Sequence, residues 1–178
     1  NILATITCSK LPQMATVRPG VLPLLQSRKN KKPHLQILPA AAFETSLTVI
    51  AENIKAAGPA VALTEAKIVI AGGQGVKKED FALLEKLAAK ARGAVGATRP
   101  VVDAGLMLPA SQIGQTGHTI QPKVYLACGI SGAVQHLVGM KNAERIIAIN
   151  KDPKAAIFQV ADYAVVGDYR TIILEMLK

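Results

Sequence analysis

The chain has 178 residues, half of them hydrophobic, and carries a net charge of +9. This length can bury the core of one domain with an appendage. Aromatic residues make up only 3% of the chain, too few for a base-stacking platform, so we expect no nucleic-acid binding. No apolar stretch has the length of a membrane span and no signal peptide is evident, so we expect no membrane insertion. Because the chain begins at Asn1 without an initiator methionine, we expect a fragment or a processed chain.

The first 39 residues differ in pattern from the rest of the chain. Residues 1–7 are predicted to form a short strand, which needs a sheet from elsewhere because a lone strand is unstable. Residues 8–33 contain four prolines and no sustained period, which is typical of a connector or extended arm. The basic cluster 28–32 is interpreted as a solvated linker, with a docking patch for an acidic partner or a phosphate backbone as the alternative.

Cys8 and Cys128 are the two cysteines, and both stand in apolar runs. We expect two buried free thiols in a reducing compartment, because neither has the spacing of a metal ligand. We expect the cytoplasm if the protein is bacterial, and the mitochondrial matrix if it is eukaryotic.

From residue 40 onward, apolar runs alternate with amphipathic segments. The clearest helix spans 78–92, with Phe81, Leu84, Leu87 and Ala88 on one face and Glu79, Asp80, Glu85, Lys86 and Lys90 on the other. Further helices are predicted at 43–57, 130–138, 154–160 and 169–177, strands at 67–71, 93–97, 123–128, 145–150 and 162–166, and a loop over 99–122. Crossovers of this length join parallel strands, so we predict a doubly wound α/β domain over 40–178 with a mostly parallel, Rossmann-like sheet.

Ligands of such sheets bind beyond the carboxyl ends of the strands. Five glycine-rich or polar segments leave the predicted strands and are expected to meet at one rim: 72–75, 98–99, 129–132, 150–152 and 166–168. The segment 129–132 follows a strand and opens a helix, which is the arrangement that holds a phosphate on free N–H groups. The pattern therefore predicts a nucleotide-like cofactor held mostly by neutral donors.

Single residues at this rim leave alternatives open. Asn150 and Asp168 end late strands, where they bind an adenosine ribose or base, or else cap helices and form turns. Arg99 is a ligand-facing cation or a surface ion-pair residue, with Asp103 as the candidate partner. His136 is either packed within its helix or part of the site, and the scattered histidines argue against a metal site.

Six ordered segments make the chain similar to a known family. The segments are 96–99, 102–105, 112–117, 129–136, 148–153 and 160–163. They resemble the C-terminal FAD-binding domain of the alpha subunit of electron transfer flavoprotein. The resemblance covers nearly the whole chain and implies that residues 1–39 are the end of an N-terminal domain plus an extended basic linker.

The resemblance implies a role for each matching residue. Thr116 would hydrogen-bond flavin N5, His136 would reach the pyrimidine carbonyl, and Arg99 would lie against the isoalloxazine ring. The adenosine end would be held by Asn150, Asp168 and Tyr169. The remaining cofactor-binding residues would be Gln74, Thr98, Gln112, Ile113, Gly114, Gln115, Ser131, Gly132, Ala133, Val134 and Gln135.

The implied function is that of an electron carrier without substrate turnover of its own. It would hold FAD, pair with a beta subunit, and accept electrons from acyl-CoA or other flavin-linked dehydrogenases. Arg99 or a charged His136 would stabilise negative charge on the reduced flavin. The alternatives are an NAD-dependent enzyme on a related fold, a deacylase or a dehydrogenase, and an interaction module that has lost its cofactor.

Three residues depart from the family pattern. Gln74 stands where many relatives have arginine, Thr98 replaces serine and His118 replaces lysine. Since two permanent charges are absent, we predict a lower flavin reduction potential than in relatives that carry them.

Overall fold

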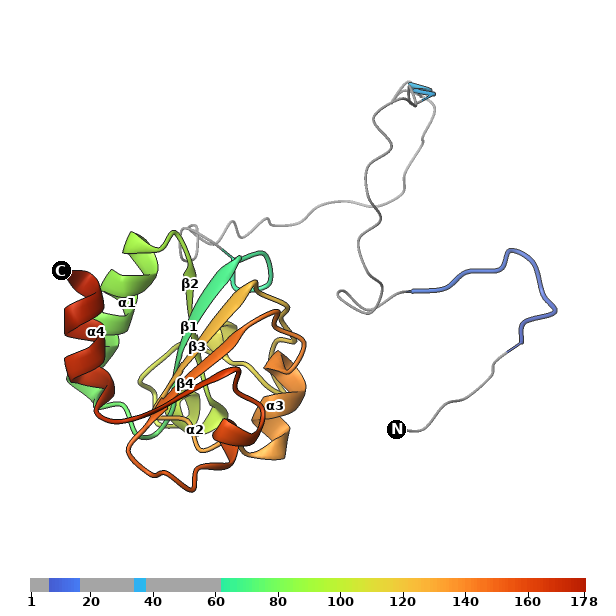
Figure 1. Cartoon of the computed structure of the whole chain (residues 1–178). Helices are drawn as coiled ribbons and strands as arrows, with labels where there is room; N and C mark the ends of the chain where they lie inside the picture. Colours follow the sequence, from blue (N-terminus) through green and yellow to red (C-terminus); the bar gives the residue numbers. More distant parts are fainter. Residues whose placement is uncertain (1–6, 17–33, 38–61) are drawn as a thin grey trace. The chain divides into compact units, whose positions relative to one another are not determined.

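The computed structural model describes residues 7–16, 34–37 and 62–178 (Figure 1). The chain divides into two units, residues 1–47 and 48–178. The strand predicted at 1–7, apart from residue 7, and the helix predicted at 43–57 lie outside the described residues, as does the expected domain boundary at residue 39. All helices and strands given below belong to residues 62–178.

Residues 62–178 form an α/β domain around a five-stranded parallel sheet. The strands are β1 (Ile68–Gly72), β2 (Ala94–Ala97), β3 (Val124–Cys128), β4 (Ile146–Asn150) and β5 (Tyr163–Val166), in the order β2-β1-β3-β4-β5. Every predicted strand is confirmed to within a residue or two at each end. Their runs of valine, isoleucine and alanine suit a parallel sheet, because both faces of such a sheet are covered.

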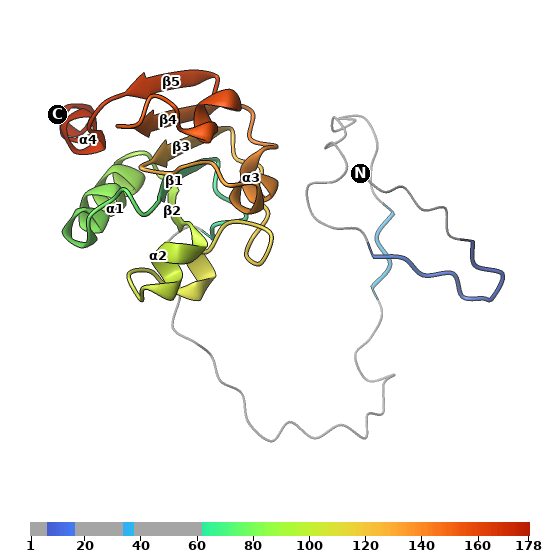
Figure 2. The same ribbon diagram turned by 90° about the horizontal axis from the view of Figure 1, so that it is seen from below.

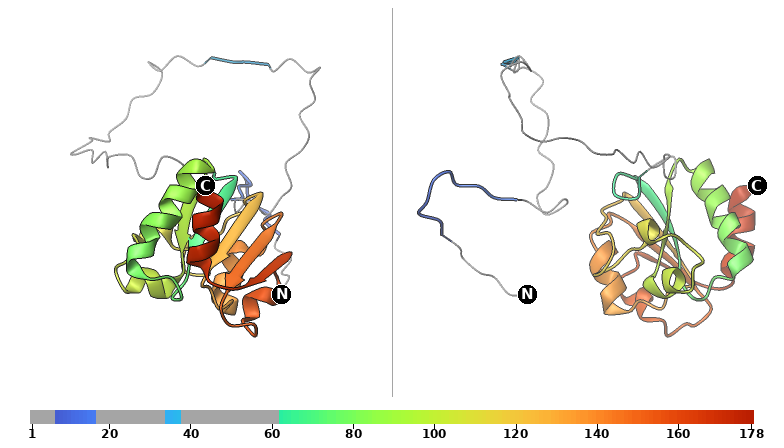
Figure 3. Two further views of the ribbon diagram at one scale, coloured as in Figure 1. Left: turned by 60° about the vertical axis from the view of Figure 1, so that its left-hand side comes forward. Right: turned by 180° about the vertical axis from the view of Figure 1, so that it is seen from behind.

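Helices cover the two faces of the sheet (Figure 2). Helices α1 (Phe81–Lys90) and α4 (Tyr169–Leu177) lie side by side on one face (Figure 3). Their core includes Leu84 and Ile173, both fully buried. The opposite core contains Tyr125 and Met140 and lies under α3 (Val134–Met140). The predicted doubly wound α/β class is confirmed.

Helix α1 begins later than predicted, and Asp80, which precedes it and was expected in solvent, is buried. Residues Lys78–Asp80 form a 3-10 turn, and the α-helix follows from Phe81. The predicted apolar face is buried, but Asp80 is buried as well. The reason is tertiary, because the Asp80 carboxylate accepts a hydrogen bond from the Tyr169 hydroxyl at 2.7 Å and lies 3.6 Å from the Arg170 guanidinium.

Two other predicted helices are shorter than expected. The helix predicted over 130–138 starts only at Val134, because Gly129 and Gly132 adopt positive φ angles of 58° and 92° and extend the turn. The segment predicted as a helix over 154–160 is a 3-10 helix at Ala156–Gln159. The terminal helix 169–177 is confirmed.

The region 99–122 was predicted as a loop, and this was wrong in part. It contains the short helix α2 (Arg99–Asp103) and a 3-10 turn at Pro109–Ser111. Each has a proline in its first turn, where the missing N–H costs no helical hydrogen bond. Prolines that indicated a loop in the sequence thus begin helices in the structure.

The cysteines differ in environment. Cys128 is buried as expected, whereas Cys8 is exposed. Burial raises the pKa of the Cys128 thiol to about 12, which keeps it protonated and unreactive. Among the described residues, no helix combines the length and the apolar character needed to cross a membrane.

Candidate functional site

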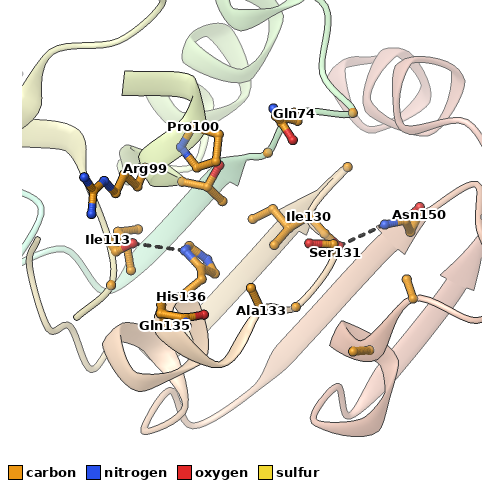
Figure 4. A pocket seen from close by; sticks show the side chains of 18 of the residues that line it. Gln74, Arg99, Pro100, Ile113, Ile130, Ser131, Ala133, Gln135, His136 and Asn150 are labelled. Carbon is orange, nitrogen blue, oxygen red and sulfur yellow. Dashed lines mark hydrogen bonds between the residues drawn. The ribbon is translucent and has the colours of Figure 1, made fainter. Parts of the chain in front are cut away.

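The candidate site is a cleft at the ends of the neighbouring strands β1 and β3. After these two strands the chain continues toward opposite faces of the sheet. Strand order 2-1-3-4-5 places this topological switch point between β1 and β3, where doubly wound folds bind nucleotides. A cavity of about 840 Å³ opens at the carboxyl ends of these strands (Figure 4). This volume is within the usual range of small-molecule sites.

Thirteen of the seventeen predicted site residues line this cleft. They are Gln74, Thr98, Arg99, Ile113, Gly114, Gln115, Thr116, Ser131, Gly132, Ala133, Gln135, His136 and Asn150. They come from four of the five segments that were predicted to meet after the strands, from the segment 113–116, and from residues 133–136 at the start of α3. The fifth segment, 166–168, does not line the cleft, because β5 lies at the edge of the sheet that is two strands away from β3.

Glycines allow the loops at the base of the cleft to pack backbone against backbone. The loop after β1 donates from the amide of Gly75 to the carbonyl of Gly129 at 3.0 Å. A Cβ on Gly73 would lie 2.3 Å from the Gly129 oxygen, and one on Gly132 would lie 2.2 Å from the Ile157 nitrogen. No other residue fits at these two positions without displacing backbone, so the glycines determine the shape of the turn.

The turn after β3 contains backbone N–H groups that have no acceptor among the described residues. The Gly129 N–H donates to the Ile149 carbonyl, and the first helical hydrogen bond of α3 is donated by the His136 N–H. Within the described part of the chain, the amides of Ser131, Gly132 and Ala133 donate to no protein acceptor. Ser131 and Ala133 are exposed to the cleft. A row of free N–H groups at a glycine turn is an anion-binding concavity.

The segment 112–118 forms one wall and is attached to α3. Gln115 N–H donates to the Gln135 carbonyl at 2.8 Å, and Ile113 N–H donates to Ala97 at the end of β2 at 2.9 Å. The Gln112 side chain is buried and donates to the Thr116 hydroxyl at 2.9 Å. Gln112 therefore does not line the cleft, but it orients Thr116, which does.

His136 is buried at the inner end of the cleft, and both ring nitrogens have protein partners. Nδ1 lies 3.0 Å from the Ile113 carbonyl oxygen (Figure 4). Nε2 lies 2.8 Å from the Tyr125 hydroxyl. Burial lowers the pKa of His136, although the hydrogen bond to Ile113 acts in the opposite direction. The structure therefore favours a neutral imidazole over the charged form considered from the sequence.

Two cations line the cleft. Arg99 begins α2, is well exposed, and its Nε donates to the Asp103 carboxylate at 3.3 Å. The structure therefore shows the ion pair with Asp103 that the sequence offered as one alternative, and Arg99 also lines the cleft. Lys154 is the second cation of the lining. Most other polar lining groups are amides, hydroxyls and backbone, in keeping with the expected neutral donors.

The three residues predicted for the adenosine end are separated in the structure. Asn150 lines the cleft, donates to the Ile130 carbonyl at 2.9 Å and accepts from the Asp152 amide at 3.0 Å. Asp168 instead caps α4 by accepting from the Arg170 amide and lies 3.5 Å from the Lys151 ammonium. Tyr169 is buried against α1. Neither Asp168 nor Tyr169 lines the cleft, so capping, the alternative weighed from the sequence, describes Asp168.

Sequence reasoning also missed part of the lining. Val134, a predicted site residue, is exposed outside the cleft. The lining residues that were not predicted are Gly73, Gly75, Pro100, Gly129, Ile130, Asp152, Lys154, Ala155 and Ala156. Most adjoin a predicted motif, and the strand exits 72–75, 129–132 and 150–152 already contained several. Lys154, Ala155 and Ala156 had no signal of their own, because only the packing of this segment beside Ser131 brings it to the cleft.

Comparison with known proteins identifies the family. Residues 62–141 match the family model described as electron transfer flavoprotein FAD-binding domain. The chain is 46% identical over 181 residues to an electron transfer flavoprotein subunit alpha of Thermoanaerobacterium thermosaccharolyticum, covering 100% of this chain and 55% of the relative. It is 44% identical to Protein FixB of Clostridium saccharobutylicum, covering 99% of this chain and 54% of the relative.

A third relative is the acryloyl-CoA reductase electron transfer subunit beta of Anaerotignum propionicum, 40% identical over 99% of this chain and 50% of the relative. The chain thus spans about half the length of these curated relatives. Nothing in these matches supports the NAD-dependent alternative. The chain belongs to the electron transfer flavoprotein alpha-subunit family, and residues 62–141 match its FAD-binding domain.

Proposed function

We propose that this chain is the FAD-binding part of a one-electron carrier, with no substrate turnover of its own. The observation that carries the proposal is the cleft at the β1/β3 switch point, with free amides at Ser131, Gly132 and Ala133. Free N–H groups at a glycine turn suit the pyrophosphate of a dinucleotide. Apart from Arg99, Asp152 and Lys154, the rest of the lining is apolar or neutral, which suits a flat ring system.

The residues present fit FAD in their donor chemistry. The turn 131–133 would hold the phosphates, and Asn150, which ends β4, would hold the adenosine end. The flavin would lie toward Arg99, Gln115 and Thr116, on the wall formed by α2 and the segment 112–118. When bound, FAD supplies the one-electron redox chemistry, and the protein adjusts its potential.

The contribution of this chain's own residues is electrostatic and positional. Arg99 is the permanent cation on the flavin side, and its guanidinium would stabilise negative charge on a flavin bound there. The Asp103 carboxylate holds the guanidinium from one side and offsets part of its charge. Neutral His136 and the Gln112–Thr116 hydrogen bond orient the wall without adding charge.

We also propose the partners that the family membership points to. The chain would pair with an electron transfer flavoprotein beta subunit and receive electrons from acyl-CoA or other flavin-linked dehydrogenases. The names of the relatives support electron transfer, and one of them names an acryloyl-CoA reductase. The compartment would be the bacterial cytoplasm, or the mitochondrial matrix in a eukaryote.

An absorbance titration of the purified chain with FAD, with and without a beta subunit, tests the proposal. We expect a flavin spectrum shifted from that of free FAD, and reduction by dithionite or light in two separate one-electron steps. NAD added in place of FAD is the control and should not bind. Absence of FAD binding in both preparations, or tight NAD binding, would contradict the proposal.

A further inference from the structure

Tyr125 lies in the middle of the core, yet it contacts a residue of the cleft. It belongs to β3 and is fully buried beneath α3. It does not line the cleft. Among the described residues, the partner of its hydroxyl is His136 Nε2 at 2.8 Å, and the two rings are 6.2 Å apart between centroids. A buried hydroxyl with one partner depends on that partner for its hydrogen bond.

The position of the protons in this pair follows from the partners. The Ile113 carbonyl can only accept, so the hydrogen between it and the ring must reside on His136 Nδ1. In the neutral ring, Nε2 is then the acceptor and the Tyr125 hydroxyl is the donor. A second proton at Nε2 would reverse this bond and leave the tyrosine hydrogen without an acceptor among the described residues.

The same arrangement reaches the wall of the cleft. The Ile113 carbonyl belongs to the segment 112–118, whose Gln115 and Thr116 line the cleft. The bond from His136 therefore connects β3 to this segment through α3, next to the bond from Gln115 N–H to Gln135. Gly114 also packs closely on α3, since a Cβ there would lie 2.9 Å from the Gln135 oxygen.

We infer that Tyr125 is a positioning residue of the flavin site, which holds His136 in its Nδ1–H form and thereby fixes the Ile113–Thr116 wall. The expected effect on flavin binding rests on the proposed function. The hydrogen-bond arrangement itself is read from the contacts of Tyr125, His136 and Ile113. Burial of both side chains supports it, because an unpaired donor or acceptor at this depth is costly.

The first experiment is histidine-selective 15N NMR on the full chain without FAD, for the wild type and Tyr125→Phe. We expect the wild type to show Nδ1 protonated and Nε2 unprotonated and hydrogen-bonded. In Tyr125→Phe the Nε2 resonance should shift toward that of a free acceptor, and the backbone amides of Gln115 and Thr116 should shift with it. Tyr163→Phe is the matched control, because Tyr163 is exposed on β5, and it should change none of these signals.

The second experiment measures FAD affinity and flavin midpoint potential for the same variants with the beta subunit present. Tyr125→Phe should weaken FAD binding about two- to tenfold, the range of one lost hydrogen bond, and should move the potential. His136→Asn combined with Tyr125→Phe should restore much of the affinity, because the asparagine amide replaces Nδ1 as donor to Ile113. His136→Gln, which retains only the Tyr125 contact, should not.

Three outcomes would overturn the inference. The first is a wild-type His136 that is protonated at Nε2 or at both nitrogens at neutral pH. The others are amides of Gln115 and Thr116 that do not respond to Tyr125→Phe, and an unchanged FAD affinity and midpoint potential in that variant. If the wild type binds no FAD, the proposed function fails. The tautomer and amide shifts still decide whether Tyr125 positions the wall.

Discussion

At the scale of single residues, the site depends on glycines whose neighbours leave no room for a side chain. Gly132 and Gly105 both have positive φ angles, 92° and 70°. A Cβ on Gly132 would collide with the backbone of Ile157, whereas nothing lies within 4 Å of a Cβ on Gly105. The pair therefore separates backbone strain from close packing, since each alanine incurs the strain and only one incurs the collision.

We expect Gly132→Ala to destabilise the chain clearly more than Gly105→Ala, and to weaken FAD binding at least tenfold. The shared strain is about 1–2 kcal/mol for a non-glycine residue in the left-handed region. The additional cost in Gly132→Ala comes from moving the turn that carries the free amides. Urea unfolding and FAD titration measure the two effects. Equal stability of the two variants, with normal FAD binding, would contradict the role assigned to this turn.

The absence of a charge at residue 74 gives a second prediction at this scale. Gln74 lines the cleft, whereas His118, the other position where a family cation is replaced, does not. The predicted low potential therefore rests on Gln74. Gln74→Arg should raise the flavin midpoint, because a nearby cation stabilises negative charge on the reduced flavin. A redox titration measures the midpoint, with Gln74→Met, a neutral side chain of similar length, as the control. An unchanged or lowered midpoint in the arginine variant would refute the prediction.

At the scale of elements, the loop after β1 is held to α4 by one tyrosine. The Tyr169 hydroxyl accepts from the Lys77 amide at 3.0 Å and donates to the buried Asp80 carboxylate at 2.7 Å. The Lys90 ammonium adds a second connection by donating to the Leu177 carbonyl at the end of α4 at 2.9 Å. Helices α1 and α4 are thereby joined at both ends, and the loop 73–77 that borders the cleft is attached to them.

Tyr169→Phe should lower the free energy of unfolding by about 1–3 kcal/mol. The substitution leaves a buried carboxylate with one hydrogen bond fewer and the Lys77 amide without its acceptor. Urea denaturation measures the change, and Tyr163→Phe on the exposed edge strand should stay within about 0.5 kcal/mol of the wild type. A Tyr169→Phe variant as stable as that control would show that the tyrosine does not hold this junction.

At the scale of the whole molecule, several weak acids are buried in their neutral forms. Burial raises the pKa of Tyr125 well above its usual value, and burial together with the Asp80 carboxylate raises the pKa of Tyr169 to about 12. Burial also raises the pKa of Cys128 to about 12. The folded chain holds these protons at a pH where the unfolded chain releases them, so stability falls as pH rises.

We therefore expect full stability from these groups below about pH 8.5, the usual cysteine pKa, and a progressive loss between there and pH 12. Urea unfolding at pH 8, 9, 10 and 11 measures it. Cys128→Ala should show a smaller loss across the same range, because one of the ionising groups is gone. A free energy of unfolding that stays constant from pH 8 to pH 11 would contradict the expectation.

The sequence determined the fold class because its signals are local. Apolar runs such as 124–128 and the amphipathic period of 81–90 predict strand and helix without reference to the rest of the chain. Glycine-rich and polar segments after the strands predicted a rim that binds a nucleotide, and four of the five segments meet there. The alpha-subunit motifs then identified the family.

Only the tertiary structure decided which strand exits meet and which polar groups are buried. Strand order is a long-range property, and it places β5 at the edge, which removes Asp168 and Tyr169 from the cleft. Asp80 meets Tyr169, 89 residues away along the chain, only after the layers pack. The same holds for His136 and its partners in β3 and in the segment 112–118. Local patterns specify which elements form, whereas the contacts between elements specify what each side chain is free to bind.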